Sequence, residues 1–140
     1  MRAKMNEKEN RFPHMKFTMP YPPSLNVYWR NFRGRMVLSS EAKKYKSSVS
    51  ELFKELYEGA VDRPDGGLQA LPTKKMVGLK IDVYRPRKSG DLDNTLKAIL
   101  DSMSGHLYED DRQVIEIHAK RHDDKDNPRV EIAVRFVNGA

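Results

Sequence analysis

Residues 77–84 alternate apolar and polar side chains, and this alternation constrains the fold of the chain more than any other segment. The apolar positions are Val77, Leu79, Ile81 and Val83. Successive side chains of a β-strand point to opposite faces, so a period of two residues puts all the apolar side chains on one face. The segment therefore predicts a half-buried strand whose apolar face needs a covering layer of secondary structure.

Two segments with helical periodicity can supply that layer. Ser39 or Ser40 stands before the first, which we expect to be a helix over about residues 40–58. Its recurring apolar residues are Val49, Leu52, Phe53 and Leu56. The second helix should begin near Asp91 and stop at Gly105, a residue suited to the end of a helix. Its buried face would consist of Leu92, Leu96, Ile99, Leu100 and Met103.

Shorter patterns predict three further strands, over residues 14–19, around Ile115–Ala119, and over residues 130–136. The stretch from Leu25 to Ser39 is expected to be a long loop or irregular strand, and residues 59–73 a loop rich in Gly, Pro and Asp. The order β-α-β-α-β-β indicates an α/β (α+β) fold, with a mixed sheet of about four strands and two main flanking helices. We expect residues 1–13 to form a flexible arm and residues 14–140 a single domain.

The charge of the chain is divided unevenly. Between Asp91 and Asp111 there are six acidic residues and one lysine, a local net charge of −5. The whole chain carries +6, so the remainder carries +11. A divalent cation would neutralise the acidic segment, and the basic remainder would suit a phosphate backbone. This distribution is typical of a nuclease.

Several functional classes are excluded by composition. The chain has no cysteine, which rules out disulfides, zinc-thiolate sites and thiol nucleophiles. The polar N-terminus does not resemble a signal peptide, and no apolar run approaches the ~18 residues of a membrane span. We therefore expect a cytoplasmic protein without a membrane partner.

The second helix carries a charged stripe beside its apolar face. Asp93, Lys97 and Asp101 follow one another at four-residue intervals, and Asp91 stands at the helix entrance. One interpretation is structural: Asp91 caps the helix, and the other three form solvated ion pairs. The alternative is catalytic: the first two aspartates, with an acid of the "EDD" loop, bind divalent metal, and Lys97 contacts the scissile phosphate.

A second notable segment mixes aromatic and basic residues. Its rings are Tyr28, Trp29 and Phe32, and its cations are Arg30, Arg33 and Arg35. Rings can stack on unpaired bases while arginines hold phosphates, although anchoring a loop to the core is the commoner fate of a single ring. A further basic group precedes the acidic segment and would guide a phosphate backbone towards it: Arg85, Arg87 and Lys88.

Four stretches in order give the chain a resemblance to a known family. They are "PPSLNVYWR", the basic turn, "GDLDNTLKAILDSMSG" and "YEDDRQV", and together they extend from about Pro22 to Val137. In this pattern the chain resembles the RusA-type Holliday-junction resolvases, which are often carried by phages and prophages. The resemblance implies an endodeoxyribonuclease that binds four-way DNA junctions as a homodimer, with Mg²⁺ or Mn²⁺ as cofactor.

The resemblance also assigns roles to residues. The family's catalytic and metal-binding aspartates correspond to Asp91, Asp93 and Asp111, with Asp110 as the alternative ligand, and its functional lysine corresponds to Lys97. Supporting roles are expected for Asn94, Asp101 and Gln113. Two other functions stay open on the residues alone. One is a basic DNA-binding module without catalysis, and the other is a metal nuclease acting on flaps or single strands.

Overall fold

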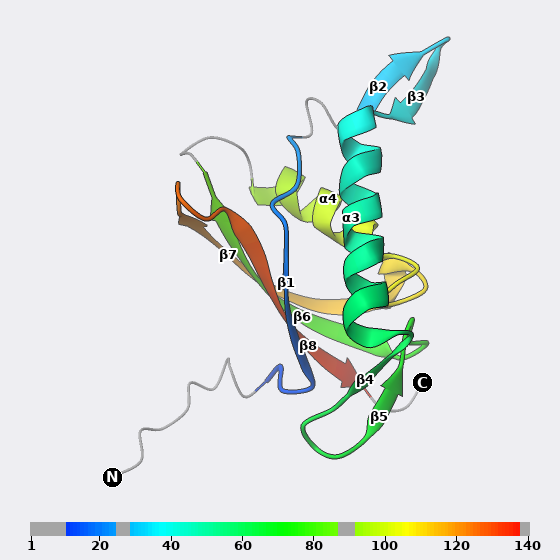
Figure 1. The fold of residues 1–140 in the computed structure, drawn as a ribbon, viewed down its shortest axis with the longest axis vertical. Coiled ribbons are helices and arrows are strands. Elements are labelled where there is room, and N and C mark those ends of the chain that lie inside the picture. The colour runs from blue at the N-terminus through cyan, green and yellow to red at the C-terminus, as the bar shows by residue number, and fades with distance from the viewer. Residues whose placement is uncertain (1–10, 25–28, 87–91, 138–140) are drawn as a thin grey trace.

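The computed structural model describes residues 11–24, 29–86 and 92–137. Its centre is a four-stranded sheet in the order β1-β8-β6-β7 (Figure 1). The strands are β1 (Met15–Met19), β8 (Arg129–Val137), β6 (Met76–Arg85) and β7 (Val114–Asp123). β6 pairs antiparallel with β8 and parallel with β7, which confirms the predicted mixed sheet.

The two long helices cover one face of this sheet. They are α3 (Ser40–Tyr57) and α4 (Leu92–Met103), and both pack on the apolar side chains of β6 and β8 (Figure 1). Ser39 caps α3 by accepting a hydrogen bond from the backbone N–H of Ala42 at 3.1 Å. The alternating apolar residues of β6 are at most 2% exposed, so the strand pattern identified the core correctly.

Three apolar residues that belong to the predicted helix and strand patterns are exposed. Leu56 is 60% exposed, because Phe53 and Tyr57 make the contacts with Phe17 at that end of α3. Ile115 and Ile117 are 55% and 40% exposed. They belong to β7, which lies at the edge of the sheet, and the pairing of β6 with β7 is irregular near Val77.

Two hairpins occupy segments that the sequence predicted as a long loop or irregular strand, residues 25–39, and as a loop, residues 59–73. β2 (Trp29–Phe32) pairs with β3 (Arg35–Leu38), and β4 (Ala60–Asp62) pairs with β5 (Leu68–Ala70). The β2–β3 hairpin projects beyond the N-terminal end of α3 (Figure 1). Arg33 and Gly34 at its tip have positive φ values of 51° and 77°, the backbone geometry that matches the twist of a tight hairpin. Arginine is not a usual residue there, so no turn signal revealed this hairpin.

The packed domain includes residues that the sequence placed in the N-terminal arm. Phe12 is fully buried, and the Arg11 guanidinium contacts the carboxylate of Glu116. Residues 1–10 lie outside the described part of the chain. No helix within that described part is long and apolar enough to cross a membrane.

Candidate active site

α4 is the element that carries the predicted charged stripe, and it joins the two parallel strands β6 and β7. Asp93, Asn94 and Lys97 are exposed on its first two turns. An acidic residue in the first turn of a helix is favoured there by the positive end of the helix dipole. Asp91 precedes α4 and lies outside the described residues.

The other predicted acids belong to the short segment between α4 and β7. Asp110 is the N-cap of the 3₁₀ turn η1 (Asp111–Gln113), and its carboxylate accepts from the backbone N–H of Arg112 at 2.9 Å. The Arg112 guanidinium also contacts this carboxylate, at 3.2 Å. The backbone hydrogen bond, followed by the side chain of Arg112, lowers the pKa of Asp110. Asp110 therefore has a structural use as a cap.

Gln113 fixes the position of this acidic segment. Its side-chain oxygen accepts from the backbone N–H groups of Glu109 and Asp110, both at 2.9 Å. Its side-chain nitrogen donates to the carbonyl oxygens of Thr73 and Lys75, both at 2.8 Å. One amide thus ties the acidic turn to the chain entering β6. The predicted supporting role of Gln113 has a concrete form here, because only a side chain with both donor and acceptor atoms can make these bonds.

Tyr108 links the same segment to α4. Its hydroxyl donates to the carbonyl oxygen of Leu100 at 2.6 Å, and its side chain is fully buried. Burial raises the pKa of Tyr108 strongly, and the neighbouring charges of Asp111, Asp101 and Asp110 raise it further. The Tyr108 hydroxyl thus joins the acidic segment to the second half of α4.

The predicted metal site is described only in part, because Asp93 and Asp111 belong to the described residues and Asp91 does not. Across residues 11–24, 29–86 and 92–137, no three His, Cys, Asp or Glu side chains are grouped to hold a metal ion. Mg²⁺ prefers oxygen donors such as carboxylates, so the predicted aspartates have the right chemistry to bind it. The third predicted ligand is Asp91.

Comparison with known proteins decides the family. A profile of the family described as "Endodeoxyribonuclease RusA" matches residues 20–135. The chain belongs to the RusA family. A crossover junction endodeoxyribonuclease of Enterobacteria phage HK97 is 35% identical over 109 residues, covering 76% of this chain and 81% of the relative. The protein of the same name from Escherichia coli K12 is 36% identical over 101 residues, covering 71% and 75%.

Within this RusA-family chain, Asp101 has a partner that sequence reasoning missed. The ammonium of Lys46 on α3 lies 3.1 Å from the Asp101 carboxylate. The sequence prediction gave Asp101 a supporting role at the site. Lys43, Lys46 and Lys54 fall on one side of α3, since each residue of a helix advances by about 100°. The spacing of these lysines, by three and then eight residues, keeps them on one side of the helix and was the signal that could have revealed this basic edge.

The predicted DNA-binding residues divide into three groups. Tyr28, Arg87 and Lys88 lie outside the described residues. Arg85 pairs with Asp123 at 2.7 Å and its side chain is only 12% exposed, so it stabilises the β6–β7 pair. The remaining four lie on the β2–β3 hairpin and are exposed: Trp29, Arg30, Arg33 and Arg35.

The exposure of the hairpin rings answers one question that the sequence left open. Trp29 is 44% exposed and Phe32 is 54% exposed. Neither ring is a buried core anchor, so the structural alternative for these two residues is wrong. The RusA fold here presents aromatic and basic side chains together on a projecting hairpin.

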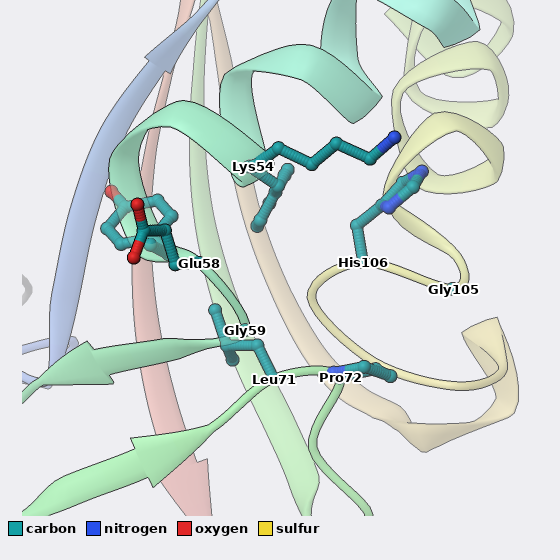
Figure 2. Close-up of a pocket in the computed structure, with 9 residues that line it drawn as sticks. Lys54, Glu58, Gly59, Leu71, Pro72, Gly105 and His106 are labelled. Carbon is teal, nitrogen blue, oxygen red and sulfur yellow. The ribbon is translucent and has the colours of Figure 1, made fainter.

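A separate cavity of about 350 Å³ lies where the C-terminal end of α3 meets the loop after α4 (Figure 2). His106 stacks on Phe53 there, with ring centroids 5.7 Å apart. Burial lowers the pKa of His106, and the charges of Lys54 and Lys46 lower it further. Figure 2 shows the Lys54 side chain extending towards the His106 ring. His106 therefore belongs to the packing between α3 and this loop.

Proposed function

We propose that this chain resolves four-way DNA junctions by paired, symmetric, metal-dependent hydrolysis of phosphodiester bonds. The observation that carries the proposal is the similarity to relatives named crossover junction endodeoxyribonucleases, such as the 35% identity over 76% of this chain with the phage HK97 protein. The similarity to such a protein of Enterobacteria phage 82, at 37% over 101 residues, supports the same substrate. The proposed place of action is the cytoplasm of a bacterial or phage-infected cell.

The proposed metal ligands are Asp91, Asp93 and Asp111, and the proposed cofactor is Mg²⁺, with Mn²⁺ as substitute. Asp111 is preferred to Asp110 because the Asp110 carboxylate already accepts from the Arg112 backbone and side chain. When bound, the metal would acidify the attacking water and stabilise the leaving oxygen. The contacts of Gln113 support this assignment, because they hold the Asp110–Asp111 turn in a fixed place.

Lys97 is the proposed phosphate-binding residue beside these acids. It is exposed on α4 one turn after Asp93, where an ammonium can stabilise charge that develops on the scissile phosphate. Arg87 and Lys88 are proposed to guide the DNA backbone towards the acids, together with the exposed arginines of the β2–β3 hairpin. Their charges act on phosphates of any sequence, so they contribute affinity rather than sequence preference.

Two symmetric cuts need two active sites, so we propose that the working form is a homodimer. One domain of this size carries one set of the proposed ligands, and a two-fold axis would relate two such sets to the symmetry of a four-way junction. Sedimentation of the protein alone and with junction DNA measures this stoichiometry directly.

The experiment that tests the function compares cleavage of a four-way junction, a flap and a linear duplex, each with Mg²⁺. We expect junction cleavage, and a loss of more than about 100-fold in rate for Asp93→Asn and for Asp111→Asn. Glu109→Gln is the matched control, because it removes a neighbouring charge that is not a proposed ligand. Wild-type cleavage rates for Asp93→Asn would overturn the metal assignment.

The two other functions give different results in the same experiment. A non-catalytic binding module would bind the junction equally well with and without Mg²⁺ and would leave every strand intact. A flap or single-strand nuclease would cut those substrates faster than the junction. Either pattern would refute junction resolution.

A further inference from the structure

A pocket lies between the β2–β3 hairpin and the first turn of α3. Its volume is about 350 Å³, at the lower end of the range of about 300–1,000 Å³ for small-molecule sites. Its walls are built from three elements in turn: β2, β3 and α3. The lining residues are Arg30, Phe32, Val37, Leu38, Ser40 and Lys43. Figure 1 shows why they meet, since the hairpin stands at the N-terminal end of this helix.

The pocket combines apolar and positively charged side chains. Val37, Leu38 and the ring of Phe32 supply its apolar surface, while Arg30 and Lys43 supply positive charge. Phe32 is 54% exposed, although a large ring usually gains stability by burial. The guanidinium of Arg33 lies 5.2 Å from the centroid of this ring, a cation–π contact that helps hold it.

The charged side chains that line the pocket are both positive, and the nearest carboxylate that contacts its lining is Glu41, 3.4 Å from the Ser40 hydroxyl. Residues 29–38 contain three arginines and no acidic residue. No carboxylate in the described part of the chain pairs with Arg30, Arg33 or Lys43. Cations without carboxylate partners beside an exposed ring suit a ligand with a flat apolar part and a negative charge. A nucleotide has both, whereas an apolar peptide would leave these cations without a counterpart.

We propose that this pocket binds one unstacked nucleotide at the branch point of the junction, with its base on Phe32 and its phosphate between Arg30 and Lys43. The inference rests on the proposed function, and adds to it the part of the substrate that the hairpin recognises. In an intact duplex each base is paired and stacked, and taking it out of the stack costs a few kcal/mol. Bases at a branch point lose part of their stacking already, so the pocket would favour branched over linear DNA.

A double-mutant cycle, in which the ring and the base are removed singly and together, tests this stacking of the base on Phe32. Junction affinity is measured in EDTA, which prevents cleavage, for wild type and Phe32→Ala. Each protein is titrated with an intact junction and with one that has abasic sites at the branch-point nucleotides. Stacking of a base on an aromatic side chain changes affinity by roughly 5- to 150-fold. We expect wild type to lose about tenfold on the abasic junction, within that range.

Phe32→Ala should lose a similar factor on the intact junction and show no further loss on the abasic one. Phe32→Trp should restore both the affinity and the sensitivity to the abasic sites, because the ring is replaced by another ring. Met36→Ala is the matched control. Met36 is 66% exposed on the same hairpin, next to Arg35, and Arg35 stands opposite Phe32. Successive strand residues face opposite sides, so Met36 lies on the face of the hairpin opposite to Phe32, and it is not among the residues that line the pocket.

Two results would overturn the inference. One is a Phe32→Ala variant that loses as much affinity on the abasic junction as wild type does, since the ring and the base would then act independently. The other is an equal loss with Met36→Ala and a change in sedimentation, since the hairpin would then be a protein contact. The proposed function fails separately: it is refuted when wild type binds but does not cut junctions in Mg²⁺, whatever the cycle shows.

Discussion

Lys46 on α3 places its Nζ atom 3.1 Å from Oδ2 of Asp101 on α4, so the two helices that cover the sheet are joined by a charge pair beside the proposed site. The two side chains are 37% and 43% exposed, and such pairs contribute about 1 kcal/mol or less. We expect Asp101→Asn to lower the free energy of unfolding by no more than this in a urea titration. Lys46→Met removes the same pair and serves as its control.

Cleavage by Asp101→Asn should fall less than cleavage by Asp111→Asn, because Asp101 is proposed to support the site and not to bind metal. A loss in Asp101→Asn as large as that in Asp111→Asn would make Asp101 a ligand. The Lys46→Met variant then separates the two roles, since it leaves the carboxylate in place.

Gln113→Glu should destabilise the acidic turn. A carboxylate cannot donate to the carbonyl oxygens of Thr73 and Lys75, which Gln113 contacts at 2.8 Å. Losing donors to partly buried carbonyls costs about 1–3 kcal/mol, which a urea titration measures. Arg112→Gln is the control, because the Arg112 side chain is 87% exposed. Equal stability of Gln113→Glu and wild type would show that these bonds do not hold the turn.

Tyr108→Phe should cost more stability than Tyr57→Phe. The Tyr108 hydroxyl donates to the Leu100 carbonyl at 2.6 Å, whereas the Tyr57 hydroxyl reaches the Lys16 carbonyl at 3.5 Å. A hydrogen bond of ordinary geometry contributes about 0.5–1.5 kcal/mol, and one at the limit of distance contributes less. Thermal unfolding of the two variants measures the difference, and the reverse order would contradict it.

Acidification should destabilise the domain through His14. Burial, followed by the charge of Arg63, lowers the pKa of His14 from its ordinary value of 6.5. The native state therefore binds this proton less readily than the unfolded chain, and protonation favours unfolding. The stabilisation is complete above the ordinary pKa and is lost as the pH falls below it towards the native pKa.

We expect the Tm of wild type to fall more than that of His14→Gln between about pH 7.5 and about pH 5.5. Only the change in Tm is compared, so a uniform destabilisation by the substitution does not affect the result. Parallel curves for the two proteins would remove His14 as the cause.

The segments with a regular repeat of apolar residues correctly predicted strand β6 and helices α3 and α4. Strand β6 and both helices followed from side chains that repeat every two or every three to four residues, because burial of one face dictates that repeat. The β2–β3 hairpin could not be found this way. Its tip is Arg33–Gly34 and all four side chains of β2 are exposed, so neither a turn signal nor an alternation marks it.

The candidate site was predictable in composition but not in arrangement. The motif placed Asp93, Lys97 and Asp111 in order along the chain, and the structure puts Asp93 and Lys97 on the exposed side of α4. Contacts between distant segments carry no local pattern, which is why the bond from Gln113 to Lys75 and the pair of Lys46 with Asp101 were missed. Asp91 stays a prediction, since it lies outside the described residues.

In the described chain, β2 and β3 form a two-stranded sheet of their own, separate from the four-stranded sheet. This separation affects how the protein can be engineered and how its relatives can diverge. Exchanging residues 29–37 for the hairpin of a relative, while keeping Leu38 because it packs on Ala42 and Ala98, would break no strand pairing in the core sheet. Chimeras of this kind should fold with the parent's stability while taking the donor's choice of DNA shape. Lineages of such nucleases could therefore change targets by altering one short hairpin, with α4 and its proposed catalytic residues left untouched.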